Sequence, residues 1–252
     1  MPLDPAKFTG GTVTARTDFS HDLWSVRIRP EVPISFRAGQ YVTVGVEVDG
    51  KLLERPYSIV SAPAEPELEL FIELVPEGLL TPHLYPLPEG APVVLRPRCK
   101  GVFLKECPVA GESHMFVATV TGIAPFVSFL RALAARHDAG DWDGDGRFVL
   151  LQGASRAHEF GYLDEMRELD ARLPWFTYIP TVSRPWESPE WPGETGRVED
   201  VLRKHADANG IDPGRAGVYL CGHPGMIANA RAVMVRRGID DKAVREEQYW
   251  PA

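Results

Sequence analysis

The stretch that decides the fold is HMFVATVTGIAPF, residues 114–126. Its first part, His114–Thr119, is an apolar run that indicates a buried strand. A turn containing Gly122 follows, and Pro125 stands where the first turn of a helix accepts proline, so Ala124–His137 is expected to be helical. A strand, a turn and a helix in succession open a doubly wound parallel sheet, which binds ligands at the carboxyl ends of its strands.

The same alternation of strand and helix continues to the end of the chain. We expect strands at Arg147–Gln152, Phe176–Val182 and Val218–Cys221, and helices at His158–Arg172, Arg197–Ala208 and Pro224–Arg237. This half therefore predicts an α/β domain built on a parallel sheet.

Before residue 98 the pattern is different, because short runs of alternating apolar and polar residues recur between turns. The clearest runs are residues 11–15, 23–28, 41–48 and 68–75, with one short helical segment at Thr81–Leu87. They predict an antiparallel β-barrel. A chain of 252 residues has room for two domains, which we place at residues 1–105 and 106–252, joined through Lys100–Glu112.

Composition limits the classes of function. Net charge is −8, which argues against a nucleic-acid partner. No apolar run approaches the roughly 20 residues of a membrane helix, and the N-terminus lacks the features of a secretory signal. Three scattered cysteines suit a reducing cytoplasm and are too few for an iron–sulfur cluster. We expect a soluble cytoplasmic protein that acts as a monomer, away from membranes.

An acidic loop at residues 141–146 resembles the start of a calcium-binding loop. The EF-hand pattern requires a bidentate Glu at its twelfth position, which is Gln152 in this chain. We therefore expect no metal and interpret the loop as a solvated turn.

Four short segments carry groups that suit a dinucleotide or a flavin. Arg55-Pro56-Tyr57-Ser58 offers a guanidinium for phosphate, an aromatic face and a hydroxyl, although a kinked strand with exposed side chains fits equally well. Gly78…Thr81 enters a short helix, where backbone amides favour anions or where Thr81 is simply the N-cap. Thr121-Gly122 and Cys221-Gly222 each follow a predicted parallel strand, although Cys221 is equally consistent with a small buried residue.

Taken in order, these four segments and the terminal Glu247-Gln248-Tyr249-Trp250 resemble the ferredoxin–NADP reductase family from about residue 8 to 250. The resemblance implies an FAD-binding barrel followed by an NADP-binding domain. It also implies a flavoenzyme that transfers hydride and electrons between NADP(H) and ferredoxin or flavodoxin.

The resemblance assigns roles to individual residues. Ser58, Cys221, Glu247 and Tyr249 would lie at the reacting rings. The cofactor-binding residues it implies are Arg55, Pro56, Tyr57, Ser58, Ile72, Leu74, Gly78, Leu80, Thr81, Thr121, Gly122, Ser155, Arg156, Ser183, Arg184, Arg197, Cys221, Gly222, Tyr249 and Trp250. Within this set, Ser155, Arg156, Ser183, Arg184 and Arg197 would meet the 2′-phosphate.

One departure from the family concerns Val120, where the family commonly has glycine. We expect its branched side chain to narrow the diphosphate turn or to alter its backbone angles. A cluster of Arg236, Arg237, Lys242 and Arg245 is a candidate docking patch for an acidic carrier, or else a solvated helix end.

Other functions remain open at this stage. The same modules occur in the reductase components of oxygenases and in stand-alone flavin or ferric reductases. A non-catalytic flavin-binding regulator would keep the diphosphate segments without needing Cys221 or Glu247.

Overall fold

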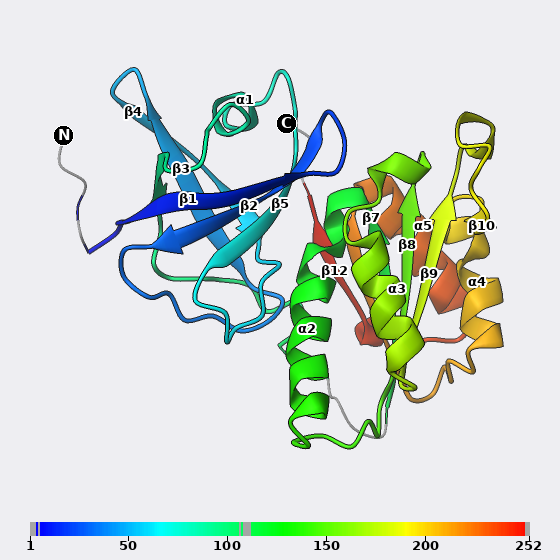
Figure 1. The fold of residues 1–252 in the computed structure, drawn as a ribbon. Coiled ribbons are helices and arrows are strands. Elements are labelled where there is room, and N and C mark those ends of the chain that lie inside the picture. The colour runs from blue at the N-terminus through cyan, green and yellow to red at the C-terminus, as the bar shows by residue number, and fades with distance from the viewer. Residues whose placement is uncertain (1–3, 5, 106, 108–111, 250–252) are drawn as a thin grey trace. The chain divides into compact units, whose positions relative to one another are not determined.

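The computed structural model describes residue 4 and residues 6–105, 107 and 112–249. It divides into two compact units (Figure 1), the first comprising residues up to Lys105 together with Ala124–Ala132, the second the remainder up to Tyr249. No helix in these described ranges is long and apolar enough to cross a membrane.

The first unit is an antiparallel sheet in the order β4-β3-β6-β1-β2-β5. Its strands are β1 (Thr9–Asp18), β2 (Leu23–Pro30), β3 (Tyr41–Val48), β4 (Lys51–Ser58), β5 (Leu68–Glu73) and β6 (Pro92–Leu95), with helix α1 (Thr81–Leu84). A bridge from Ile59 to Leu70 brings the two end strands together, so that the sheet curls into a barrel. The predicted antiparallel barrel is confirmed.

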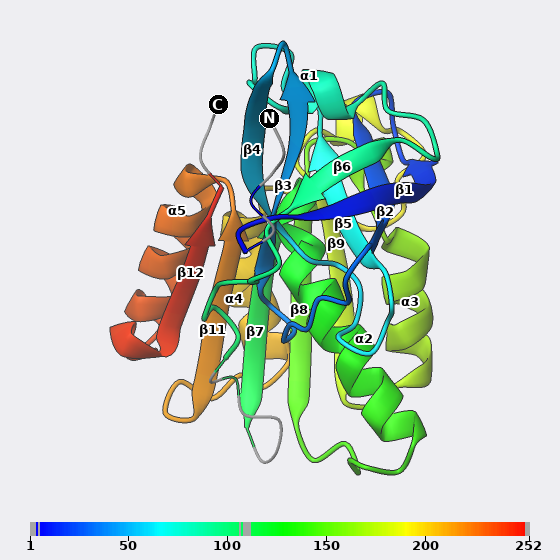
Figure 2. The same cartoon turned by 90° about the vertical axis from the view of Figure 1, so that its left-hand side faces the viewer.

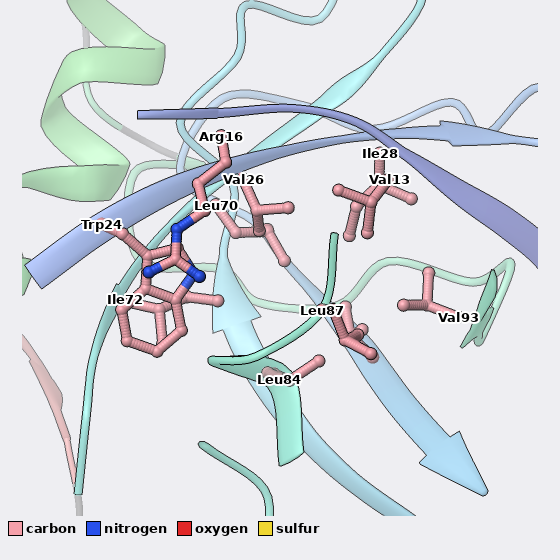
Figure 3. A pocket seen from close by; sticks show the side chains of 11 residues that line it. Val13, Arg16, Trp24, Val26, Ile28, Leu70, Ile72, Leu84, Leu87 and Val93 are labelled. Atoms are coloured by element: carbon pink, nitrogen blue, oxygen red, sulfur yellow. The ribbon is translucent and has the colours of Figure 1, made fainter. Parts of the chain in front are cut away.

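Apolar side chains fill the barrel and leave one small cavity of about 10 Å³, which Figure 3 shows from close by. Arg16 reaches over this interior and stacks on the rings of Trp24 and Tyr85 at 5.2 and 4.5 Å. The space suffices for about one water molecule, so the cavity is a packing feature and no cofactor site.

The second unit is a parallel sheet in the order β10-β9-β8-β7-β11-β12. Its strands are β7 (Ser113–Thr119), β8 (Arg147–Ala154), β9 (Phe176–Val182), β10 (Glu194–Thr195), β11 (Ala216–Gly222) and β12 (Val244–Gln248). Its helices are α3 (Leu163–Arg172), α4 (Val198–Ala208) and α5 (Pro224–Arg236); α2 (Ala124–Asp138) ends here after beginning in the first unit. Figure 2 shows α5 beside the edge strand β12. The predicted α/β sheet is confirmed.

Three local predictions were wrong. The expected helix at His158–Arg172 is split, because Tyr162 adopts a left-handed φ of 63° and Phe160 leaves the helix to stack on Trp191. The helix at Thr81 ends at Leu84, where two prolines follow closely. The acidic loop is not wholly solvated, since Trp142 is buried against Trp175 at 4.7 Å.

The N-terminal part of α2 is held in the barrel unit by polar contacts. Arg131 pairs with the buried carboxylate of Glu69 at 2.7 Å, and Glu69 also binds Arg27 at 2.8 Å. The hydroxyl of Ser128 donates to the carbonyl of Ser61 at 2.7 Å. A buried carboxylate is tolerated only when it is paired in this way, so these contacts fix the start of α2.

Candidate active site

Two loops meet at the carboxyl edge of the parallel sheet, after β7 and after β11. These strands are neighbours, with Ala118 opposite Cys221, and the strand order reverses between them. The backbone N–H of His223 donates to the hydroxyl of Thr119 at 3.0 Å and ties the loops together. Such a switch point is where open α/β sheets bind nucleotides.

The two loops approach so closely that neither tolerates a side chain at the contact. A Cβ on Gly122 would lie 2.3 Å from the carbonyl oxygen of Cys221. Gly222 has a φ of +131°, and a Cβ there would lie 2.2 Å from the Thr119 hydroxyl. The crossing of the two loops therefore requires both glycines. It also fixes the position of Thr121, which precedes Gly122 in the first loop.

Val120 keeps the conformation that a glycine would adopt. Its φ is 43°, in the left-handed region that β-branched residues rarely occupy. The backbone of the turn therefore carries strain at Val120, and an effect of the side chain on the diphosphate turn stays a prediction. The turn before Thr121 stores strain of roughly 1–2 kcal/mol.

The C-terminal segment returns to the same edge as β12, parallel to β11, with Glu247 opposite Cys221. The backbone N–H of Tyr249 donates to the carbonyl of Gly222 at 3.2 Å, and its hydroxyl donates to the carbonyl of Thr121 at 3.5 Å. Tyr249 thus lies over both loops. Trp250 lies outside the described residues.

Cys221 is fully buried beneath this segment. Burial raises the pKa of its thiol well above the ordinary value, the nearby Glu247 carboxylate raises it further, and a hydrogen bond with Tyr249 opposes both. The side chain therefore stays a neutral thiol near pH 7 and suits a small, apolar wall rather than a nucleophile.

The expected flavin segment lies on β4, which stands at one end of the barrel sheet order. Arg55 is exposed, and among the described residues its side chain bonds the backbone carbonyl of Glu54 alone, at 2.9 Å. Tyr57 is half-buried, and burial raises the pKa of its hydroxyl while Arg55 lowers it. Ser58 is buried and Pro56 is exposed. The remaining donors of Arg55 stay available to bind a diphosphate.

In the segment that begins at Gly78, the Thr81 side chain is bonded within its own turn. The Thr81 hydroxyl donates to the carbonyl of Val75 and accepts from the N–H of the same residue, both at 3.0 Å. Leu80 stands at the N-cap position in place of Thr81. The hydroxyl closes the turn and is not directed at a ligand. The side chains of Ile72 and Leu80 are buried in the barrel core, with Leu74 packed against it, so any contact of these residues with a cofactor would use their backbone.

The residues expected at the 2′-phosphate gather after β8 and β9. Backbone bonds link Ser183 to Ala154 and Arg184 to Ser155, each at 2.9 Å. Arg184 and Arg197 are exposed. Arg156 is instead engaged by two carboxylates, Glu159 at 2.9 Å and Glu187 at 2.5 Å.

Sequence reasoning missed Glu187, whose partner Arg156 stands 31 positions earlier in the chain. It also missed two contacts of the late basic cluster. Arg237 pairs with Asp207 at 2.7 Å, and Arg245, although exposed, makes a hydrogen bond with Tyr219. The role of this cluster in docking stays a prediction.

Comparison with known proteins gives the class first. An oxidoreductase FAD-binding domain model matches residues 11–101, and an oxidoreductase NAD-binding domain model matches residues 116–232. The two matches account for the barrel and the parallel sheet, and together they define a two-domain flavin- and nicotinamide-dependent oxidoreductase.

Individual proteins narrow the class. The flavodoxin/ferredoxin–NADP reductase of Escherichia coli strain K12 is 30% identical over 233 residues, covering 90% of this chain and 89% of that protein. The reductase component of phenol 2-monooxygenase from Pseudomonas sp. strain CF600 is 29% identical, over 98% of this chain and 67% of that protein. A ferredoxin NADP⁺ reductase from Neisseria gonorrhoeae with bound FAD and NADP superposes with a TM-score of 0.83 at 22% identity, over 97% and 99% of the chains.

The chain belongs to the ferredoxin/flavodoxin–NADP reductase family. It is a flavoenzyme with one domain for FAD and one for a nicotinamide dinucleotide. The described residues fit both groups: Arg55 has no carboxylate partner among them, and the glycine crossing holds two close-packed loops at the nucleotide edge.

The strain at Val120 predicts that glycine is more stabilising than alanine at this position, the reverse of the usual order. Val120→Gly should be more stable than Val120→Ala by about 1 kcal/mol, because only glycine adopts a φ of 43° without cost. Urea unfolding midpoints of the two variants measure the difference. The same pair of substitutions at Arg203, an exposed position within α4, should give the ordinary order with alanine more stable. A more stable alanine variant at position 120 would show that the turn is not strained.

Proposed function

We propose that this enzyme exchanges electrons between NADP(H) and a small acidic carrier, ferredoxin or flavodoxin, through bound FAD. The observation that carries the proposal is similarity to a flavodoxin/ferredoxin–NADP reductase along nine-tenths of both chains. We further propose that it works as a monomer in the cytoplasm, where its three free cysteines stay reduced.

The flavin, when bound, accepts electrons in pairs and releases them singly. The protein's part is binding and orientation. Arg55 binds the diphosphate, Tyr57 packs its ring on the flavin, and Ser58 offers a hydroxyl near the reactive nitrogen. The exposure of Arg55 supports its role.

On the nucleotide side, Thr121 and Gly122 meet the diphosphate of NADP, and Cys221 and Gly222 line the place of the nicotinamide. Glu247 and Tyr249 lie beside the place of the nicotinamide, with Tyr249 covering the loops until the coenzyme displaces it. The hydrogen bonds from Tyr249 to Thr121 and Gly222 support this role, because they involve the segments that the coenzyme needs.

Two features of the barrel unit favour docking of an acidic carrier. Arg37, Arg98, Lys100 and Lys105 are exposed, and none makes an ion pair with another described residue. Arg98, Lys100 and Lys105 lie in one segment, which the backbone bonds of Tyr41 with Lys100 join to the stretch that carries Arg37. No acidic residue occurs at positions 32–46 or 90–105. We call these four residues the basic barrel end. Val102 lies between Lys100 and Lys105 in the chain, and its apolar side chain is 69% exposed, as suits a protein interface.

A second candidate is the reductase component of an oxygenase, favoured by the similarity to the phenol 2-monooxygenase reductase. Assay with ferredoxins, flavodoxins and oxygenase components of the same host separates the two. Rapid reduction of an oxygenase component, with slow reduction of every ferredoxin and flavodoxin, would favour the second candidate.

Arg184→Ala with Arg197→Ala should raise the KM for NADPH roughly a hundredfold and the KM for NADH less than twofold. Charge-assisted bonds to a dianionic phosphate contribute about 1.5–3 kcal/mol each, and NADH lacks that phosphate. Steady-state kinetics with both coenzymes measure the effect. Arg203→Ala, a 75% exposed cation on α4, is the matched control and should change neither KM. Equal changes for NADPH and NADH would contradict the assignment.

The basic barrel end can be tested by reversing two of its charges. Arg37→Glu with Lys105→Glu should slow carrier reduction about tenfold at low salt, with the difference fading as added salt screens the charges. Reduction of an uncharged dye should not change. Lys51→Glu, an exposed cation at the start of β4, serves as control. Carrier reduction that is as fast as in the unmodified enzyme would exclude this surface as the docking site.

A further inference from the structure

Glu187 lies at the centre of a charged cluster beside the expected 2′-phosphate residues. One of its oxygens accepts from Nε of Arg156 at 2.5 Å, and the other lies 3.6 Å from Arg184. Hydrogen bonding from Arg156 lowers the pKa of the Glu187 carboxyl, and Trp186 also contributes a hydrogen bond. Glu187 is therefore ionised near pH 7 and held in one place by three neighbours.

This arrangement changes the charge available to a phosphate. A second guanidinium nitrogen of Arg156, Nη1, binds Glu159 at 2.9 Å, and Glu159 also accepts from the backbone N–H of Ser155 at 2.8 Å. Of the three arginines Arg156, Arg184 and Arg197, only Arg197 has no carboxylate partner among the described residues. Two carboxylates thus offset most of the positive charge of the cluster.

The two coenzymes respond differently to such a cluster. A 2′-phosphate is dianionic, so it is repelled by the Glu187 carboxylate and must compete with it for Arg156 and Arg184. The 2′-hydroxyl of NADH carries no charge and can donate a hydrogen bond to a carboxylate. A carboxylate placed here lowers the affinity for NADPH. It leaves the affinity for NADH unchanged or raises it.

We propose that Glu187 is a specificity-determining residue that holds down the preference of this enzyme for NADPH over NADH. The inference rests on the proposed function, since it concerns the coenzyme of the same site. Its action goes through Arg156 and Arg184, which it keeps paired. Removing its charge frees Arg184 for the 2′-phosphate and leaves Arg156 with Glu159 as its one carboxylate partner among the described residues.

The test compares Glu187→Gln with the unmodified holoenzyme, using an uncharged dye as acceptor. The ratio of kcat/KM for NADPH to that for NADH should rise about tenfold, through a lower KM for NADPH at unchanged kcat. Glu187→Asp keeps the charge and should keep the ratio low. Glu190→Gln, an exposed carboxylate three residues away, is the matched control and should shift the ratio less than twofold.

Equilibrium binding gives a readout that does not depend on turnover. Calorimetry of the holoenzyme should show adenosine 2′,5′-bisphosphate binding about tenfold tighter to Glu187→Gln, and 5′-AMP binding unchanged. An unchanged coenzyme ratio and unchanged bisphosphate affinity would overturn the inference, as would equal gains in Glu190→Gln. If neither coenzyme reduces the flavin of the unmodified protein, the proposed function fails, and this inference fails with it.

Discussion

The nucleotide half of the site depends on one steric constraint, the crossing of two loops at the end of β7 and β11. Gly122 lies against the backbone of Cys221, and Gly222 lies against Thr119, with no space for a Cβ at either place. This contact sets where Thr121 lies, and it provides the bare edge on which Tyr249 rests. Val120 adopts a left-handed backbone conformation in the turn next to the crossing. This conformation costs strain energy at the turn.

The arginines fall into two groups, those that pair with a carboxylate and those that do not. Arg27 and Arg131 pair with the buried Glu69 and hold the start of α2 in the barrel unit. Arg55 and Arg197 have no carboxylate partner among the described residues and stand where a diphosphate and a 2′-phosphate are expected. A guanidinium already paired with carboxylates has less to offer a phosphate, which is why we propose Arg55 and Arg197, rather than Arg27 and Arg131, as phosphate ligands. Arg156 belongs between the groups, because Glu159 and Glu187 occupy it.

Much of this could be predicted from the sequence, because hydrophobic period and glycine position are local signals. The strand and helix of residues 114–137 followed from their own pattern, as did the barrel strands. Contacts between distant residues could not be predicted in this way. The Thr81 hydroxyl is committed to Val75, and Arg156 is paired across 31 positions, neither of which a motif reveals. Strand β12 escaped prediction because VREEQ is polar and its pairing with β11 comes from the tertiary fold.

The central claim is that the loop crossing builds the coenzyme site independently of the flavin site. The most direct test is titration of Gly122→Ala with NADP⁺, followed through the visible spectrum of the bound flavin. A Cβ at this position would lie 2.3 Å from the Cys221 carbonyl oxygen. The account predicts a yellow protein that keeps its FAD and loses the spectral change on adding NADP⁺, while Gly214→Ala, with its nearest atom at 3.6 Å, behaves like the unmodified enzyme. A normal NADP⁺ titration of Gly122→Ala would contradict it.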